Sequence, residues 1–499
     1  MKASILSVLL LFSTLYLSIS CSPVKIPQDA SLVNQVPSTY PDYAQSAIPF
    51  NIAPLNFRIQ ENGDKFITVA RSRTGKTLTA EGKDIHWEID SWHELLKDCR
   101  NDTLYMDVYI FGAGRWNRYT PIKCYVAMEA IDTYLSYRLI EPSYVLYENI
   151  SINQRNLTNF EEQVIFNNGR PVEDSRGKCI NCHSYQDYNR TGRMQFHMRE
   201  YKGGTLIAEG KEVKKINLKA GKLISAGVYP SWHPKLNLIA YSTNVTRQHF
   251  HSKSSQKVEV IDLASDLILY DVDRNEVTTI CNDSNALETF PSWSPDGKFL
   301  YYASASYPNG IKHDEETMFA HYKEIHYDIY RRAFDASKHT FSAPDTLFSA
   351  SKIGKSATFP RISPDGHYLL FTMGDYGTFH IWHKSSDLYL MNLATKETVP
   401  LKEANSPEAE SYHSWSSNGA WIVFSSRRDD GSYTRPYICY FKNGKASRPF
   451  ILPQENPRYY KNLFKSFNVP EFMVKPVEVS RGEWVKAAEA PAKQAVYRP

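Results

Sequence analysis

Several features that would assign a chain to a common functional class are missing from this sequence. Its 499 residues carry 58 Lys and Arg against 54 Asp and Glu, a net charge of only +4, and no basic stripe holds interleaved aromatic residues. Nucleic acid is therefore not an expected partner, because its phosphates are bound by clustered positive charge. The chain also lacks a G-x-S-x-G nucleophile motif, a Gly-rich phosphate loop and an H-E-x-x-H zinc motif, so none of these enzyme classes is indicated.

Long apolar runs are scarce as well. Only Ile5–Ser20, 16 residues long, approaches the length of a membrane span, and it falls short of the ~20 residues that a bilayer needs. Lys2 precedes this run and Cys21 follows it, which is typical of a cleaved signal peptide. We therefore expect residues 1–20 to be removed on export.

Cys21 stands where cleavage is expected. The run before it resembles a bacterial lipobox, in which the first mature residue is a lipid-modified Cys, so the resemblance implies a lipid anchor at Cys21. Ser18 holds the usual place of the lipobox Leu and Leu17 lies one position further back, so cleavage by ordinary signal peptidase stays the alternative. Residues 21–45 are rich in Pro, Ser and Gln, a composition that predicts a tether.

Cysteine is rare too, with seven residues, yet two of them form the most informative motif. Residues 179–183 read C-x-x-C-H, and a random chain of this composition would hold about 0.003 such pentapeptides. Two thiols at this spacing reach the two vinyl groups of one porphyrin, and the adjacent histidine meets the iron. The motif therefore predicts one covalent haem c, attached through Cys179 and Cys182, with His183 as an iron ligand.

Three alternatives to haem compete for the C-x-x-C-H motif. The first is a disulfide or redox dithiol, which usually begins a helix in a βαβ unit, and this β-rich context does not offer one. The second is zinc, which needs further ligands, and the nearest nitrogen donors with a regular spacing are the pairs His249 with His251 and His380 with His383. The third is a chance match.

The other cysteines show no metal-ligand spacing. They are Cys99, Cys124, Cys281 and Cys439. A disulfide between Cys99 and Cys124 is one expectation for an exported protein, and two buried free thiols are the other.

A second iron ligand is expected close to the motif. The segment Arg193–Glu200 places Met194, His197 and Met198 within 11 to 15 residues of His183. On a strand, Met194 and Met198 share one face and His197 lies on the other, so at most one set faces the haem. We expect His197 in preference to Met198, and the alternative for each is an ordinary strand or core residue. The arginines available to the haem propionates are Arg193 and Arg199.

Short β-branched and alternating runs fill the region from residue 46 to 165. The expected strands are Lys65–Ala70, Ile85–Ile89, Leu104–Phe111 and Lys123–Ala127. Gly, Asn and Asp turns separate them, and the only good helix candidate is Ser91–Cys99. This pattern predicts a compact sandwich of two sheets, of immunoglobulin type.

A phrase of about 16 residues occurs four times in the second half of the chain. It begins at Tyr229 (YPSWHPKLNLIAYSTN), Phe290 (FPSWSPDGKFLYYASA), Phe359 (FPRISPDGHYLLFTMG) and Tyr412 (YHSWSSNGAWIVFSSR). Each copy joins an aromatic residue to a tight turn and then to an alternating strand, which is one propeller blade repeated. The spacings of 53 to 69 residues are longer than the usual ~40 to 45, so we expect loop insertions, chiefly at 249–258 and 307–325.

The phrase resembles the repeat of TolB-like propellers, a WD-like family, over about residues 190–465. The resemblance implies five or six blades, with degraded copies at Met194–Ile224 and Tyr437–Leu452. Polar residues of such repeats can line the central channel, and the candidates are Arg361, His413, Arg427 and Arg428. Their alternative role is structural.

The expected fold is therefore all-β, with an N-terminal immunoglobulin-like β-sandwich followed by a five- or six-bladed TolB-like β-propeller. The expected boundaries are 1–20 signal peptide, 21–45 anchor and tether, 46–165 sandwich, 166–192 connector with the haem motif, 193–465 propeller and 466–499 flexible tail.

The whole arrangement resembles lipoproteins of Bacteroides-type bacteria that join such a motif to such a propeller. The resemblance implies a c-type cytochrome-like protein for electron transfer or haem-based sensing, anchored in the outer membrane and facing the periplasm or the cell surface. The propeller would dock a redox partner or another envelope protein, and an enzymatic role is not expected. The alternative is a non-catalytic propeller module or scaffold without haem, which binds envelope protein or glycan.

Overall fold

The computed structural model describes residues 24–141, 149–169, 179–199, 202–254, 256–307 and 314–499. The expected signal peptide and Cys21 lie outside these ranges. The described chain is all-β, as expected, with four short helices: α1 (Ile89–Asp98), α2 (Glu315–Ala320), α3 (Tyr459–Asn462) and α4 (Arg481–Glu489). Within these ranges no helix has the length and apolar character to cross a membrane.

The N-terminal region holds two sheets that share one core with α1. The seven-stranded sheet runs in the order β1 (Ser31–Val33), β9 (Arg115–Tyr119), β8 (Asp102–Gly112), β10 (Ile122–Ala127) and β3 (Ala47–Pro49), with β5 (Lys65–Arg71) and β6 (Thr77–Glu81) joined through β8. The three-stranded sheet is β2 (Thr39–Tyr40), β4 (Phe57–Ile59) and β7 (Asp84–Ile85). Trp92, Leu104 and Val108 are fully buried in the shared core. The immunoglobulin-like β-sandwich itself stays a prediction.

One expected strand is too long, because a capped helix begins within it. The sequence predicts a strand over Ile85–Ile89, but β7 ends at Ile85 and α1 begins at Ile89. The Glu88 carboxylate accepts hydrogen bonds from the backbone N–H groups of Asp90 and Ser91, which makes Glu88 the N-cap of the helix. The helix prediction at Ser91–Cys99 is confirmed.

In the rest of the described chain the strands form six antiparallel units, and the second and third of these are joined in one sheet by a single parallel pairing of Ser265 with Leu287. The first five are β14 (Ile180–Tyr185), β15 (Arg193–Met198), β16 (Gly204–Glu209) and β17 (Glu212–Asn217); β18 (Gly227–Trp232), β19 (Leu238–Phe250), β20 (Val258–Asp271) and β21 (Glu276–Cys281); β22 (Ala286–Trp293), β23 (Phe299–Ser306), β24 (Asp328–Asp335), β25 (Thr340–Phe341) and β26 (Asp345–Phe348); β27 (Ser356–Ile362), β28 (Tyr368–Gly374), β29 (Asp387–Asn392) and β30 (Thr398–Pro400); and β31 (Glu410–Trp415), β32 (Trp421–Ser426), β33 (Arg435–Lys442), β34 (Lys445–Ala446) and β35 (Phe450–Ile451). The sixth is β36 (Ser466–Met473), β11 (Tyr134–Ile140), β12 (Ser151–Asn156) and β13 (Glu162–Asn167).

The first strand of each unit lies innermost, and these six strands close a ring. In the described chain β14 lies next to β18, then β22, β27, β31 and β36 follow in order, and β36 lies next to β14 again. Tryptophans of the repeated phrase join neighbouring units, since Trp232 Nε1 donates to Ser184 O (3.3 Å) and Trp415 Nε1 donates to Arg361 O (3.2 Å). A closed ring of radially arranged antiparallel sheets is the architecture of a β-propeller.

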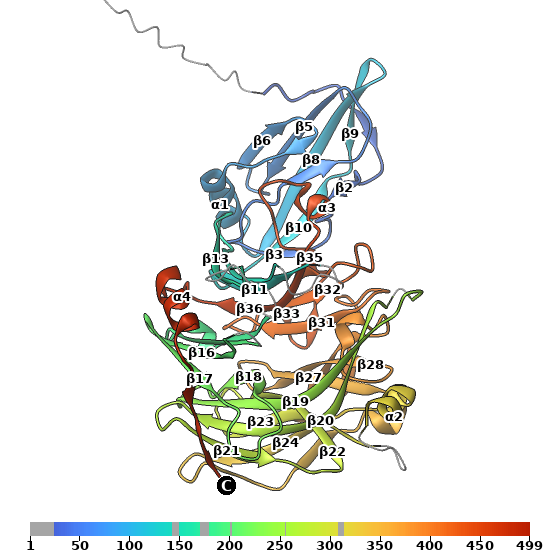
Figure 1. Ribbon diagram of the computed structural model, residues 1–499. Coiled ribbons are helices and arrows are strands. Elements are labelled where there is room, and N and C mark those ends of the chain that lie inside the picture. Colours follow the sequence, from blue (N-terminus) through green and yellow to red (C-terminus); the bar gives the residue numbers. More distant parts are fainter. Residues whose placement is uncertain (1–23, 142–148, 170–178, 200–201, 255, 308–313) are drawn as a thin grey trace, which may run out of the picture.

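The sixth unit corrects three expected boundaries. Its inner strand β36 comes from the end of the chain and its outer strands β11, β12 and β13 come from before the haem motif, so the two ends of the ring are tied by one sheet. Figure 1 shows β11 and β36 side by side between the N-terminal region and the other units. Residues 134–167 therefore belong to the ring and not to the sandwich, and 466–473 belongs to the ring and not to a tail. The expected connector also differs, because 180–185 is the inner strand of the first unit.

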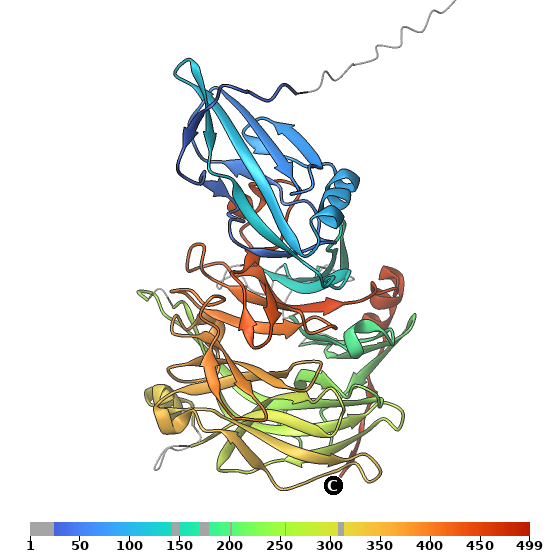
Figure 2. The ribbon, with the colours of Figure 1, turned by 180° about the vertical axis from the view of Figure 1, so that it is seen from behind.

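The remaining C-terminal residues pack on the ring, in contrast to the flexible tail that the sequence predicts. β37 (Lys493–Gln494) pairs with β17 and β38 (Val496–Arg498) pairs with β21. α4 buries Trp484 completely, with its ring 5.0 Å from that of Phe196. Figure 2 shows the resulting order from behind, with the N-terminal region at one end of the molecule and the C terminus at the other.

A recurring β-bulge places one residue of every unit at the ring axis. Each inner strand has two bulge residues opposite one residue of its neighbour, and the first of the two has a left-handed φ. These first residues, with φ in degrees, are Cys182 (55), Tyr229 (48), Phe290 (54), Phe359 (54), Tyr412 (49) and Val469 (51). Four of them start the repeated phrase, and their rings contact one another in sequence, edge-to-face or tilted, with centroids 4.5, 4.0 and 5.1 Å apart. Cys182 and His183 of the C-x-x-C-H motif therefore occupy the bulge of the first unit. The same two positions are Tyr-Pro, Phe-Pro, Phe-Pro, Tyr-His and Val-Pro in the other units.

Candidate functional site: a pocket on the ring axis

The bulges surround one end of a cavity of about 410 Å³. This volume falls within the ~300–1,000 Å³ of pockets that hold small molecules and cofactors. Its wall includes Cys179, Cys182 and His183 together with the four aromatic bulge residues and the indole of Trp382. The structure thus brings both cysteines and the histidine of the C-x-x-C-H motif to one apolar-lined pocket.

Both thiols of the motif are free in the structure. Cys179 lies just before β14 and is 7% exposed, and Asn181 Nδ2 donates to its Sγ (2.8 Å). Burial raises the pKa of the Cys179 thiol, and the nearby Arg138 guanidinium opposes that rise. Cys182 is partly buried at the first bulge position, where the other units carry an aromatic ring or Val469.

His183 is a buried residue of the pocket wall, and its ring lies near the backbone of Val469. Its side chain is 2% exposed, and neither Nδ1 nor Nε2 makes a hydrogen bond of good geometry. Burial lowers the pKa of His183 to about 3, the Arg138 charge adds to this effect, and the backbone of Val469 opposes it. The imidazole is therefore neutral at pH 7, and a lone pair on one ring nitrogen is available to a metal ion.

The expected second iron ligands lie elsewhere. β15 is the strand that the sequence predicts, and its Met194 and Met198 pack in an apolar cluster with Trp484. His197 lies on the other face, where its Nδ1 is 3.1 Å from Thr205 Oγ1. Burial lowers the pKa of His197 to about 3. The pocket wall includes none of Met194, His197 and Met198, and their role as iron ligands stays a prediction.

Arginines contribute much of the polar wall of the pocket. Of the two expected at the haem propionates, Arg199 lines the cavity and donates its backbone N–H to Cys179 O (2.9 Å), whereas Arg193 pairs with Glu209 (3.4 Å) away from it. The other arginines of the wall are Arg138, Arg361 and Arg427. Arg138 is not among the site residues that the sequence predicts, because its strand β11 joins the ring only through β36.

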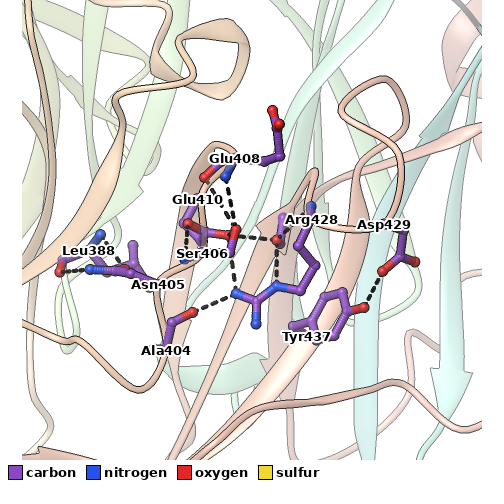
Figure 3. A network of polar contacts seen from close by, with 10 residues as sticks. Leu388, Ala404, Asn405, Ser406, Glu408, Glu410, Arg428, Asp429 and Tyr437 are labelled. Atoms are coloured by element: carbon purple, nitrogen blue, oxygen red, sulfur yellow. Dashed lines mark hydrogen bonds and ion pairs between the residues drawn. The ribbon is translucent and has the colours of Figure 1, made fainter. Parts of the chain in front are cut away.

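Three of the four channel candidates line the pocket: Arg361, His413 and Arg427. His413 is held by the backbone, with its Nε2 3.1 Å from Leu370 O. Arg428 is not part of the pocket wall. Its Nη2 lies 3.1 Å from Glu410 Oε1, and the same guanidinium donates to Ser426 Oγ (2.8 Å) in the network of Figure 3. Ser406 Oγ also donates to Glu410 (2.6 Å), so this cluster fixes the loop before β31. Arg428 therefore fits the alternative that the sequence analysis gives for these candidates, a structural role in place of a channel-lining one.

The first expected insertion builds part of the pocket wall. β19 and β20 are extended into a long hairpin around residues 249–258, and Gln248, Lys257 and Val258 from this hairpin line the cavity. The second insertion carries α2, which supports the hairpin because Arg247 pairs with Glu315 (2.6 Å) and the rings of His249 and Phe319 stack at 4.1 Å. The two inserted segments therefore pack against each other beside the pocket.

The zinc alternative finds no ligand set in the ranges that the structure describes. No group of three or more His, Cys, Asp or Glu side chains is arranged to hold a metal ion there. His383 pairs with the buried Glu259 (3.0 Å), and His380 Nδ1 lies 2.7 Å from Thr358 Oγ1. Cys99 and Cys124 are both buried free thiols, so the disulfide expectation for this pair is wrong.

Comparisons with known proteins add little beyond the fold. No protein family model matches the chain, and no curated protein matches it in sequence. An oligogalacturonate lyase from Vibrio parahaemolyticus is similar in structure, with a TM-score of 0.35 and 12% identity over 60% of this chain and 70% of that one. The β-propeller domain of the Trilobed protease from Pyrococcus furiosus has a TM-score of 0.32 and 11% identity, over 69% of this chain and 90% of that one. At these values the likenesses carry no inference about activity, and the propeller architecture rests on the ring of strands itself.

Proposed function

We propose that the axial pocket holds one covalently attached haem c and that the protein is an electron carrier or a haem-based sensor. One observation carries this proposal: the two thiols and the histidine of a single C-x-x-C-H motif line the same 410 Å³ cavity, and within the described residues neither ring nitrogen of that histidine makes a hydrogen bond of good geometry. Burying an imidazole that makes no well-formed hydrogen bond is unfavourable for folding, because the ring loses its hydrogen bonds to water and gains none of equal strength. A metal ion bound to it would remove that cost.

The residues of the pocket suit a porphyrin in other respects. Cys179 and Cys182 would each form a thioether, and the neutral His183 would bind the iron, which supplies one-electron chemistry when present. The aromatic residues Tyr229, Phe290 and Phe359, whose rings contact one another, offer apolar surface that would exclude water from one side of a porphyrin. The guanidinium groups of the wall would raise the reduction potential, since nearby positive charge favours the reduced form.

We also propose that the six antiparallel units are six blades. The C-x-x-C-H motif then sits on the inner strand of the first blade, and the blade that closes the ring is built from both ends of the propeller. The shared bulge with a left-handed first residue in all six inner strands supports this count. In this arrangement the propeller frames the cofactor site and offers its faces to a redox partner or another envelope protein.

Export and lipid anchoring complete the proposal. They rest on the apolar segment Ile5–Ser20 and on Cys21. Lipid modification would tether the chain to the outer membrane through residues 21–45. Cys21→Ser expressed with a radiolabelled fatty acid should lose the label that the wild-type chain takes up, and equal labelling of both would contradict a lipid at Cys21.

The experiment that tests the haem uses expression with a haem-attachment system. A pyridine haemochrome spectrum and a mass increase on the peptide with Cys179 and Cys182 are expected. Cys179→Ala with Cys182→Ala should abolish both signals. Cys439→Ala is the matched control, because Cys439 is also a buried free thiol but lies outside the pocket. A colourless wild-type protein with both thiols unmodified would contradict the proposal and favour the haem-free binding module.

A further inference from the structure

Three arginines of the pocket wall come from consecutive units of the ring. Arg361 lies on β27, Arg427 follows β32, and Arg138 lies on β11. These strands belong to the fourth, fifth and sixth units, so the three guanidinium groups form an arc along one side of the axis. We call them the arginine arc.

The arc has few internal partners. Arg361 makes one long hydrogen bond, from Nη1 to Pro360 O (3.4 Å). Arg138 donates from Nη1 to Asn181 Oδ1, and its buried Nε has no partner. Arg427 donates from Nε to Ile381 O (2.5 Å) and from Nη1 to Ser432 O, and its guanidinium lies 3.4 Å above the centre of the Trp382 ring, so all its partners are uncharged. In the described chain none of the three forms an ion pair with a carboxylate.

The two acidic residues of the pocket wall do not balance this charge. Glu141 is engaged with Lys465 (3.8 Å) and with Asn149 (3.0 Å). Glu471 is buried and its Oε2 makes no hydrogen bond; the charges of Glu471 and Arg361 attract each other, but the two side chains form no ion pair in the described chain. Three buried or partly buried guanidinium groups that face a single buried carboxyl group leave an excess of positive charge in the pocket, which is unfavourable, so a negative ligand would complete the site.

We propose that the arginine arc binds carboxylate groups of a ligand in the axial pocket. The proposal deepens the proposed function, on which it rests where the ligand is the cofactor: the two propionates of the porphyrin would then lie on Arg138, Arg361 and Arg427. A free polycarboxylate is the second source of the same chemistry. Arginine suits both, because its planar fork matches a carboxylate with two parallel hydrogen bonds.

The test uses the full chain in two forms, haem-loaded and as the colourless Cys179→Ser, Cys182→Ser variant. Citrate is the probe, and calorimetry measures its binding. The colourless form should bind citrate, more weakly as NaCl is added. Arg361→Gln should lower the affinity about tenfold or more, and Arg138→Gln should also lower it. Arg115→Gln, on the exposed surface of β9, should leave it unchanged. Thermal melts confirm that each variant is folded.

The haem-loaded form separates the two sources. If propionates occupy the arc, citrate should not bind this form, and Arg361→Gln should lower the reduction potential of the loaded protein because a positive charge is lost. Failure of haem attachment with citrate binding intact would contradict the proposed function and support the arc. Absence of citrate binding to the colourless form, or equal affinity for wild-type and Arg361→Gln versions of it, would overturn the arc.

Discussion

The bulge of the first unit and the bulge of the fourth unit have the same backbone and different chemistry. Cys182 and Phe359 both have a left-handed φ, at 55° and 54°, and both face the ring axis from the inner strand. The residue that follows is His183 in one and Pro360 in the other. Phe359 packs against the rings of Phe290 and Tyr412, 4.0 and 5.1 Å away, whereas Cys182 leaves the axis without a ring on its side. The repeat thus provides one backbone scaffold. The first unit carries a thiol and an imidazole on it, at the positions where the fourth unit carries Phe359 and Pro360.

The largest expected effect comes from removing that difference. Cys182→Phe with His183→Pro gives the first unit the bulge sequence of the third and fourth units. The backbone conformation is already the one that Phe-Pro adopts there, so we expect a folded protein with cooperative melting. Haem attachment should be lost completely, measured by absorbance and by mass of the intact chain. Attachment of haem to this variant through Cys179 alone, at the wild-type level, would contradict the role given to Cys182 and His183.

The next effect tests the packing side of the comparison. Phe359→Ala removes a buried ring that contacts two other rings, so it should lower the free energy of unfolding by about 3 kcal/mol, the range of Phe-to-Ala changes in cores. Chemical denaturation monitored by tryptophan fluorescence measures it. Phe464→Ala is the control, since Phe464 is 70% exposed and should change stability by less than about 0.5 kcal/mol. Equal effects of the two changes would show that the axial aromatic residues are not part of the core.

A smaller effect concerns pH. Burial holds the pKa of His183 at about 3 in the folded colourless chain, whereas the unfolded chain has the ordinary value near 6.5. Between pH 6.5 and 3 the unfolded state therefore binds more protons, and stability falls as the pH is lowered. His183→Gln should reduce the slope by up to about 1.4 kcal/mol per pH unit in this window. His367→Gln, at an exposed turn, is the control. An unchanged slope in His183→Gln would contradict a neutral buried His183.

The smallest expected effect concerns the inserted hairpin that distinguishes the second unit from the others. The ion pair between Arg247 and Glu315 is about half exposed at both ends, so Arg247→Ala should cost less than about 1 kcal/mol. The hydrogen-exchange rate of the backbone amides in residues 246–258 should rise in Arg247→Ala, whereas the amides of the inner strands should keep their protection. A global loss of protection would show that the hairpin is required for closure of the ring.

Much of the ring can be predicted from the sequence because its signal is local. The four phrases that start at Tyr229, Phe290, Phe359 and Tyr412 each contain a bulge, a turn and a strand, and the structure places them as four consecutive inner strands. The strand pattern also predicts the face alternation of Met194, His197 and Met198. The residues that cover each face cannot be predicted in this way, because Trp484 of α4 comes from the far end of the chain.

The first unit is predicted only in part, because the expected copy at Met194–Ile224 covers β15 to β17 but not the inner strand β14, and the expected copy at Tyr437–Leu452 is wrong, because these residues are strands of the fifth unit. The sixth unit escapes prediction, and both misses have physical reasons. In the first, Cys182 and His183 replace the aromatic residue and proline that mark the phrase, so the sequence predicts a connector there. In the sixth, Val469 and Pro470 keep only the proline, and the partner strand β11 lies near the other end of the chain. Non-local pairing of this kind leaves no periodic pattern in the sequence.

The most direct test of the account is the mass of the mature chain from cells with a haem-attachment system. One haem bound through the peptide that contains Cys179 and Cys182, with a low-spin absorption spectrum that changes in His183→Ala, is the predicted result. A chain of unmodified mass, whose two thiols react freely with an alkylating reagent after unfolding, would contradict it.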